Sequence, residues 1–369
     1  MGQLLTAAVG VAALAAKHAT TADRDRRVPA EVAEAVVEAG FARHFVPASR
    51  GGDAGSFTEL TRAVAAVGEG CTATAWIAAL LAAAARMTAH LPDEGQAEVW
   101  SDGADTVVVA ALVPFGKAEP VEGGWRLSGE WPYISGVDFA DWALVCGNVL
   151  TDGKPAPHYF AVPRAEHKVV DTWFTLGMRG TGSNTLVLED VVVPASRVTA
   201  RDSVIDGRGS SSPAPCHNVP LRAVNGLPFC APALGAARAM LSGWTASTGQ
   251  KIRNGATAGR PVDKSALSLT LAEAAGEIEV VELLLSRAAE IADRADVTSG
   301  ETARSARDYA LAIRHLRSAV DRLFAAGGTS VQTESSPLAR IWRDVHAIAS
   351  HMVIQLEPAA LAYAEEVLR

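Results

Sequence analysis

The sequence predicts an α+β protein in which a helical N-terminal region, a β domain and a C-terminal helix bundle follow one another. Three observations predict this order. Alanine-rich helical patterns come first, short β-branched runs separated by turns follow, and long amphipathic patterns return near the end of the chain. At 369 residues the chain is long for a single core, so more than one domain is expected.

Residues 1–105 are expected to form the N-terminal helical domain. Leu4–Ala16 is apolar, but no Lys or Arg precedes it, and a secretory signal has its positive charges first. The run is also too short to span a bilayer, so we interpret it as a buried first helix. Pro29–Gly40 begins with proline and ends with glycine, as a short helix does. Ser56–Val67 repeats this pattern, and Thr72–His90 is rich enough in Ala and Leu to be buried on most sides.

Residues 106–200 are expected to form the β domain, a compact barrel or sandwich. Gly123-Gly124 is a hairpin-type turn, and a glycine-punctuated loop at Gly177–Thr185 leads into an apolar run that stops at Pro194. The expected strands are residues 107–112, 125–129, 142–146, 159–163 and 186–193.

The last third of the chain is expected to be a four-helix bundle, residues 229–369. Helices are predicted over Leu267–Ala292, over Ala303–Ala326 and from about Pro337 onward. Residues 201–228 are rich in Ser, Pro, Gly and Asn, which favours a surface loop or lid. Such a bundle often buries its remaining apolar face against a second copy, so a homo-oligomer, dimer or tetramer, is expected.

Charge and cysteine usage narrow the function classes. A net charge of -8 and a pI near 5.6 give no electrostatic reason to expect nucleic acid or an anionic membrane as partner. The four cysteines are far apart and form no CxxC pair, so neither a metal site nor a disulfide framework is expected. A reducing cytoplasm is the simpler compartment.

Three segments, in their order and spacing, resemble the acyl-CoA dehydrogenase fold. The first is Leu127–Gly136 followed by Ala140–Trp142, and the second is the Gly177–Pro194 stretch. The third is Ala326–Ser330 followed by Pro337-Leu338 and Arg340–His346. With the domain order, they cover nearly the whole chain.

The resemblance divides between two branches of that superfamily. Most straight-chain dehydrogenases carry a glutamate base a little beyond an Arg-Asp pair, whereas here the corresponding place holds Met352 with His351 beside it. A thioether is no base near neutral pH, and the nearest acid, Glu357, is more than a helical turn away. The chain is similar instead to two-component flavin-dependent monooxygenases. These have a tryptophan ahead of a Ser-Gly pair, an Arg-Gly-Thr-Gly-Ser-Asn loop and a Trp-Arg-Asp-x-His segment.

This branch implies an enzyme that takes reduced FAD or FMN, with FAD slightly preferred, from a separate NAD(P)H:flavin reductase. Molecular oxygen is the co-substrate and forms a C(4a)-hydroperoxide on the flavin, which hydroxylates an aromatic or electron-rich small molecule such as a phenol, an indole or a natural-product intermediate. An acyl-CoA dehydrogenase or oxidase is the alternative function, and a flavin-binding relative without catalysis, or a scaffold, is a third.

The resemblance also implies site residues. Ser135 would hydrogen-bond flavin N(5), and His351 would face the C(4a) side, stabilising the peroxide or accepting a substrate proton. A serine that completes its own turn and a histidine buried in a core are the alternatives. On an ideal helix His346 lies about 140° away from His351, so the two rings are not expected to act as a pair.

Other residues are candidates for cofactor and substrate contacts. Trp131, Tyr133 and the strand residues Ala111, Leu112 and Val113 would wall the isoalloxazine ring, with core packing as the alternative. Arg253, and Gly327, Gly328 and Thr329 from a neighbouring subunit, would bind the flavin phosphate, with a solvated arginine and a helix-ending turn as alternatives. The candidates for substrate contacts are His90, Arg179 and His346. Asn184 would either approach the ligands or fix its own loop.

Overall fold

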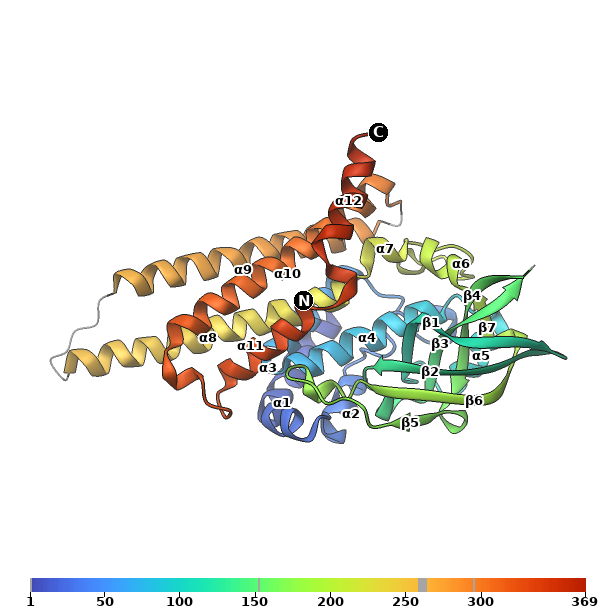
Figure 1. Cartoon of the computed structure of the whole chain (residues 1–369), viewed down its shortest axis with the longest axis horizontal. Coiled ribbons are helices and arrows are strands. Elements are labelled where there is room, and N and C mark those ends of the chain that lie inside the picture. The colour runs from blue at the N-terminus through green and yellow to red at the C-terminus, as the bar shows by residue number, and fades with distance from the viewer. Residues whose placement is uncertain (1, 152, 258–263, 295) are drawn as a thin grey trace.

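The computed structural model describes residues 2–151, 153–257, 264–294 and 296–369. Figure 1 shows a central sheet on one side, a long helix bundle on the other, and the N-terminal helices between them. The predicted order of helices, sheet and helices is confirmed. The N-terminal helices are α1 (Gln3–Asp25), α2 (Ala30–Glu38), α3 (Phe57–Gly70), α4 (Thr72–Thr88) and α5 (Asp93–Val99).

Helix α4 is the central helix of the molecule. All of its residues except Leu80 and Ala83 are buried, because it packs against α3, against the first strand of the sheet and against the first long helix of the bundle. The alanine-rich composition that predicted this burial also explains it, since small side chains let neighbouring backbones approach closely.

Helix α1 extends well beyond the apolar run that predicted it. By length and composition it could cross a membrane, the one such helix found among the described residues. It nevertheless buries a single stripe and packs against α3, where the Leu4 N–H donates to Glu59 Oε1 at 3.1 Å. One buried stripe is the pattern of a helix lying on a protein core. The stripe consists of Leu4, Ala8, Val11, Ala15, Ala19 and Ala22.

The strands form one seven-stranded sheet with the order β5-β6-β2-β1-β3-β4-β7. Strands β1 and β3 pair in parallel, and the other pairs are antiparallel. The predicted hairpin turn is present, with Gly123 in the left-handed region at φ 77. Among the described residues the edge strands β5 and β7 are not paired with each other, so the sheet stays open where a barrel or sandwich was expected. The strands are β1 (Val108–Val121), β2 (Gly124–Ile134), β3 (Trp142–Thr151), β4 (Lys154–Pro163), β5 (Lys168–Val170), β6 (Asn184–Pro194) and β7 (Val198–Ala200).

Residues 201–228 are packed against the N-terminal helices, and the prediction of a surface loop or lid needs correction. The segment contains the short helices α6 (Arg201–Asp206) and α7 (Leu221–Val224). His217 is fully buried and its Nε2 lies 2.6 Å from the carbonyl oxygen of Phe45. Arg86 on α4 donates to the carbonyl oxygens of Cys216 and Val219. The Arg86 side chain, distant in sequence, thus satisfies backbone carbonyl groups of a segment whose composition predicts exposure to solvent.

The C-terminal bundle consists of α8 (Leu227–Thr257), α9 (Ser265–Ala292), α10 (Ser299–Gly327) and α11 (Pro337–Ala349), followed by α12 (Leu356–Val367). The helix predicted from Pro337 onward is two helices, and α12 projects away from the body (Figure 1). Pro358 has no N–H to donate to the carbonyl of Ile354, which disfavours one continuous helix at this point. His351 therefore lies in a break between helices, and the angle expected between it and His346 does not apply.

Candidate active site

Trp76 on α4 brings together side chains from three distant parts of the chain. Its indole Nε1 donates to Ser135 Oγ at 2.9 Å, immediately after β2. Its ring centre lies 5.0 Å from that of Phe229 on α8 and 5.9 Å from that of His351. The two residues predicted to be catalytic, Ser135 and His351, thus lie close to one buried tryptophan.

Ser135 is the outer end of a row of polar side chains that continues into the protein. Its Oγ lies 2.7 Å from Ser183 Oγ, and Ser183 Oγ lies 2.7 Å from Thr181 Oγ1. Thr181 in turn donates to the carbonyl oxygen of Met178 at 2.8 Å. The glycine-punctuated loop before β6 thus holds the hydroxyl that follows β2.

His351 begins the short 3-10 helix Met352–Ile354, where its Nδ1 accepts a hydrogen bond from the Val353 N–H at 3.3 Å. Its ring stacks on Phe229 with centres 4.1 Å apart. Burial lowers the pKa of His351 to about 4, and no charged group contributes to this shift. The ring is therefore neutral near pH 7. With Nδ1 accepting, the neutral ring carries its hydrogen on Nε2.

The prediction that both Trp131 and Tyr133 wall a ring is wrong for Trp131. In a regular strand, residues two apart share a face. Here the pairing of β2 with β6 is irregular after Trp131, and Tyr133 has a left-handed backbone with φ 67. Trp131 is consequently fully buried and donates to the carbonyl oxygen of Cys146 at 2.7 Å, whereas Tyr133 is 73% exposed.

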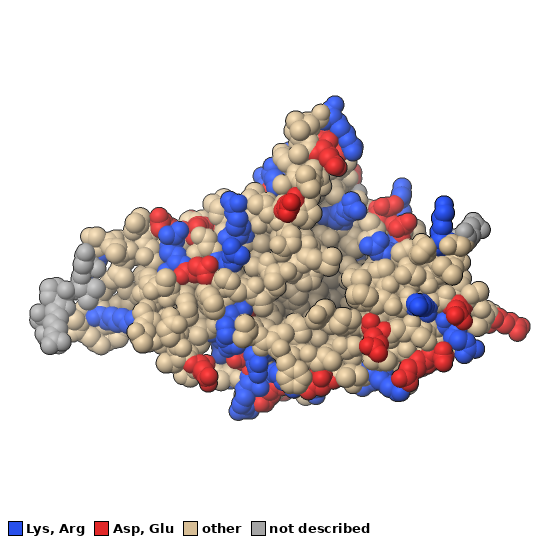
Figure 2. All heavy atoms as spheres, viewed as in Figure 1, with Lys and Arg blue, Asp and Glu red and all other residues tan. Residues whose placement is uncertain are grey.

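An apolar cavity lies between α3, α4, α8 and β1. Leu112, predicted to be near the ligands, lines it together with Phe229, which also contacts His351. Leu80 and Ala83, the two residues of α4 that are not buried, line it as well. Its few polar lining residues are Thr61, Arg86 and Asn225. Figure 2 shows a hollow between the C-terminal segment and the sheet whose visible surface carries no charged side chain.

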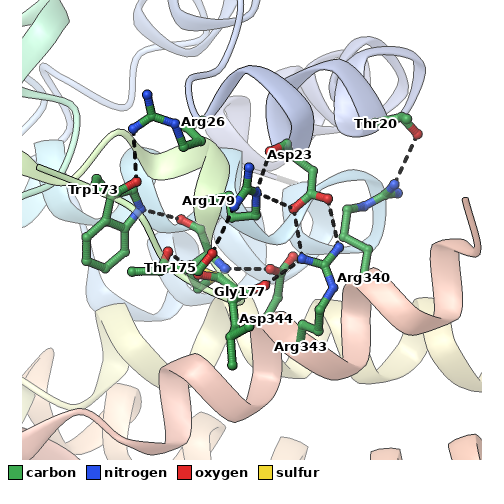
Figure 3. Close-up of polar contacts among 12 residues, drawn as sticks. Thr20, Asp23, Arg26, Trp173, Thr175, Gly177, Arg179, Arg340, Arg343 and Asp344 are labelled. Carbon is green, nitrogen blue, oxygen red and sulfur yellow. Dashed lines mark hydrogen bonds and ion pairs between the residues drawn. The ribbon is translucent and has the colours of Figure 1, made fainter. Parts of the chain in front are cut away.

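Arg179 belongs to a network that joins the loop before β6 to α1 and α11 (Figure 3). It donates to the carbonyl oxygens of Asp23 and Thr175 at 2.8 and 3.0 Å. Arg343 binds the carboxylate of Asp23 and the carbonyl oxygen of Leu176. These bonds occupy Arg179 within the protein, apart from the Trp76 group, so the structure gives no support to its predicted contact with substrate.

Asp344 is the buried member of the same network. Its Oδ1 accepts the Met178 N–H at 2.6 Å. Burial, with a smaller contribution from nearby Asp23, raises the pKa of Asp344 to about 6, although this hydrogen bond and the charges of Arg340 and Arg343 lower it. Gly177 lies so close to α11 that an added Cβ would be 2.1 Å from the Arg343 carbonyl oxygen. The loop that carries Thr181 and Ser183 is thus fixed to the helix that precedes His351.

The other two predicted substrate residues also lie apart from the Trp76 group. His346 Nε2 is 2.8 Å from Asp321 Oδ1, and its ring lies 4.4 Å from that of Trp342. His90 is buried with its Nδ1 3.2 Å from the carbonyl oxygen of Arg208, and burial lowers its pKa to about 4.

Among the candidate phosphate residues, Arg253 lies near the end of α8, and Gly327, Gly328 and Thr329 lie at the end of α10. Lys251 donates to the carbonyl oxygen of Gly327 at 3.0 Å, and Arg253 bonds Gln250 one turn away. Gly328 has φ 73, and Thr329 begins a short 3-10 turn. Asn184 fixes its own loop, since its Oδ1 accepts from the N–H groups of Thr172 and Trp173.

Sequence reasoning did not find Trp76, Phe229 or Ser183 as members of the site. Trp76 is the one aromatic residue in an otherwise alanine-rich helix, which is the signal that could have found it. Phe229 and Ser183 carry no such signal, because their role depends on which distant segments meet.

Family models for the N-terminal and the C-terminal domain of acyl-CoA dehydrogenases match residues 6–103 and 227–356. Fold and sequence together define the class, and the chain belongs to the acyl-CoA dehydrogenase family. The FADH(2)-dependent resorcinol hydroxylase, oxygenase component, of Rhizobium sp. (strain MTP-10005) is 32% identical over 95% of this chain and 90% of its own length.

Two solved structures have the same fold along almost the whole chain. The 3-HSA hydroxylase from Rhodococcus sp. RHA1 superposes with a TM-score of 0.93 at 26% identity, over 100% of this chain and 97% of that one. XiaF from Streptomyces sp., in complex with FADH2 and glycerol, gives 0.90 at 25% identity, over 99% and 94%. The chain is thus a flavin-dependent monooxygenase of the oxygenase-component type, as the sequence motifs predicted.

Proposed function

We propose that this chain hydroxylates a small aromatic substrate with reduced flavin that a separate NAD(P)H:flavin reductase supplies. The bound reduced flavin would provide the chemistry that activates dioxygen. The protein residues would hold the flavin and substrate and exclude water. The similarity to an oxygenase component that is named a resorcinol hydroxylase supports both the reductase and the aromatic substrate. FAD is the preferred flavin on the same ground.

The residues around Ser135 fit a flavin ring. Tyr133, two residues before Ser135, and Leu176, in the loop before β6, are 73% and 85% exposed, so their apolar surfaces are open to a ligand. Ser135 is partly exposed and so is open to a ligand, while its partners Trp76 and Ser183 are buried. We assign Ser135 to flavin N(5), and Tyr133, Leu112 and Val113 to the edge and face of the ring.

The neutral environment of His351 is the observation that best supports the proposed oxygenase function. An acyl-CoA dehydrogenase needs a carboxylate to remove a proton from carbon, and no charged group shifts the pKa of His351. Glu357, the nearest acid in sequence, is exposed in the first turn of α12. This arrangement favours oxygenation over the dehydrogenase alternative.

We assign His351 a hydrogen-bonding role toward the reacting groups. Its Nδ1 accepts from the Val353 N–H, and the neutral ring then offers the Nε2–H as a donor. Of the two roles expected for His351, stabilising the activated oxygen suits this tautomer better than accepting a substrate proton does.

The apolar cavity is the proposed place for the substrate ring. Its lining is almost wholly apolar, which suits an aromatic molecule, and Phe229 lines it while stacking on His351. Arg86 lines the same cavity, and its Nη1 has no hydrogen-bond partner among the described residues. A phenol or another substrate with one polar group would match this distribution.

We further propose a cytoplasmic homo-oligomer, a dimer or tetramer. Leu269 and Leu283 on α9 are 61% and 71% exposed, and Leu361 on α12 is 62% exposed. An apolar surface of this kind is typical of a subunit interface. Arg253 and the Gly327–Thr329 turn lie at the far end of the bundle from Ser135, so any phosphate contact from them would be made to a neighbouring subunit's flavin.

The test supplies purified protein with chemically reduced FAD, oxygen and a panel of phenols and indoles, and measures hydroxylated product and hydrogen peroxide. We expect product with at least one substrate. His351→Ala and Ser135→Ala should each lower product and raise peroxide while the far-UV circular dichroism stays unchanged. If no substrate gives product while an acyl-CoA bleaches the bound oxidised flavin without oxygen, the dehydrogenase alternative is correct.

A further inference from the structure

The polar row that includes Ser135 has only one side chain that a ligand can reach. Trp76, Ser183 and Thr181 are 8%, 4% and 2% exposed, whereas Ser135 is partly exposed. The row joins Trp76 Nε1, Ser135 Oγ, Ser183 Oγ, Thr181 Oγ1 and the Met178 carbonyl oxygen through contacts of 2.9, 2.7, 2.7 and 2.8 Å. Each hydroxyl in it has a single hydrogen to donate.

The groups at the two ends of the row, the Trp76 indole N–H and the Met178 carbonyl oxygen, determine which way each hydroxyl hydrogen points. A carbonyl oxygen only accepts, so Thr181 donates its hydrogen to Met178. Ser183 must then donate to Thr181, and Ser135 must donate to Ser183. An indole N–H only donates, so Ser135 also accepts from Trp76. Ser135 is left with one lone pair and no hydrogen for a ligand.

We infer that Trp76, Ser183 and Thr181 are positioning residues that make Ser135 a hydrogen-bond acceptor and thereby select the reduced flavin. The inference rests on the proposed function, which assigns Ser135 to flavin N(5). Reduced flavin carries a hydrogen on N(5), and oxidised flavin has a lone pair there. An acceptor at Ser135 bonds the first and opposes the second, so the enzyme takes the flavin in the form that a reductase delivers.

The opposite hydrogen order would leave a contact without a hydrogen. If Thr181 donated to Ser183, and Ser183 to Ser135, the Thr181 hydroxyl and the Met178 carbonyl would face each other at 2.8 Å with two acceptors. The Met178 carbonyl oxygen also accepts from Trp173 Nε1 at 2.9 Å and from the Thr181 N–H at 3.1 Å, so it is satisfied in either order. Two oxygens 2.8 Å apart with no hydrogen between them nevertheless repel each other, which disfavours the opposite order. Replacing Thr181 by valine removes this restriction, because Ser183 can then donate to Ser135 and Ser135 can donate to a ligand.

The experiment measures the dissociation constants of reduced and oxidised FAD without oxygen, for the full-length protein and its variants, by equilibrium dialysis. The quantity compared is the ratio of the oxidised to the reduced constant. We expect wild type to favour reduced FAD, and Thr181→Val to lower the ratio about tenfold, the effect of one hydrogen bond. The matched control is Thr185→Val, four residues further on at the start of β6. Its hydroxyl bonds Thr172 at 2.8 Å and lies outside the row, so its ratio should equal that of wild type.

An unchanged ratio in Thr181→Val would overturn the inference, and so would an equal fall in Thr185→Val. Ser183→Ala provides a second reading, since it also frees the Ser135 hydrogen and should lower the ratio. It decides the matter if Thr181→Val does not fold. If wild type binds neither form of FAD, the proposed function fails and not merely the selection. If it binds both forms and the variants leave the ratio alone, only the selection fails.

Discussion

Asp344 provides a test of the contact between the loop before β6 and α11. Its carboxyl is buried and accepts the Met178 N–H, and burial raises its pKa from the ordinary aspartate value of 3.8 to about 6. The unfolded chain therefore ionises this group at lower pH than the folded protein does. As pH rises from below the first value to above the second, the folded state loses stability relative to the unfolded state. The two pKa values differ by about 2 pH units, which corresponds to about 3 kcal/mol.

Asp344→Asn keeps an oxygen for the Met178 N–H and removes the titration. The midpoint of urea unfolding is measured for both proteins at one protein concentration, at several pH values from about 4 to about 7.5. Because every other titrating group is common to both proteins, the difference between them isolates Asp344. We expect wild type to lose about 2.5 kcal/mol relative to Asp344→Asn over this range, since the remainder is lost below pH 4. A difference that stays constant with pH, or that changes in favour of wild type as pH rises, would refute the reasoning.

Three further predictions concern the site and its support. Burial lowers the pKa of His351 to about 4 and keeps its ring neutral. The product yield that depends on His351, measured as the wild-type yield minus the His351→Ala yield, should therefore stay level from about pH 5.5 to 8. A loss of this difference centred near the ordinary histidine pKa would contradict the prediction. His351→Gln should lower product yield strongly and His346→Gln only slightly, because His346 is bound to Asp321; equal losses would restore His346 to the site. Gly177→Ala places a methyl group against the Arg343 carbonyl and should cost on the order of 2–3 kcal/mol in thermal or urea unfolding; an unaltered midpoint would show that the two backbones can separate freely.

Local patterns predicted most of the elements because local chemistry determines them. The proline and glycine around residues 29–40 mark the ends of a real helix, and the turn at Gly123 is a real hairpin. The break before α12 and the packing of residues 201–228 were missed. The first depends on a proline beyond the break, and the second on bonds from Arg86 and Phe45, which are far away in sequence.

The site was predictable only in part, for a related reason. Motifs suggested Ser135 and His351, and the structure brings both to Trp76. Sequence spacing placed Trp131 and Tyr133 on one face, but the left-handed backbone at Tyr133 separates them. No spacing rule relates Phe229 or Ser183 to these residues, because their meeting is a property of the assembled domains.

The late position of His351 in the chain has a consequence for biosynthesis. A ribosome synthesises a protein from its N-terminus. The segments that surround Ser135 therefore leave the ribosome and begin to fold before His351 is added. An incomplete polypeptide that stops after α11 would retain the serine and its neighbours without the ring that stacks on Phe229. Such a chain would lack the hydrogen-bond donor that we propose for the reacting groups, so it should form less hydroxylated product than the full protein.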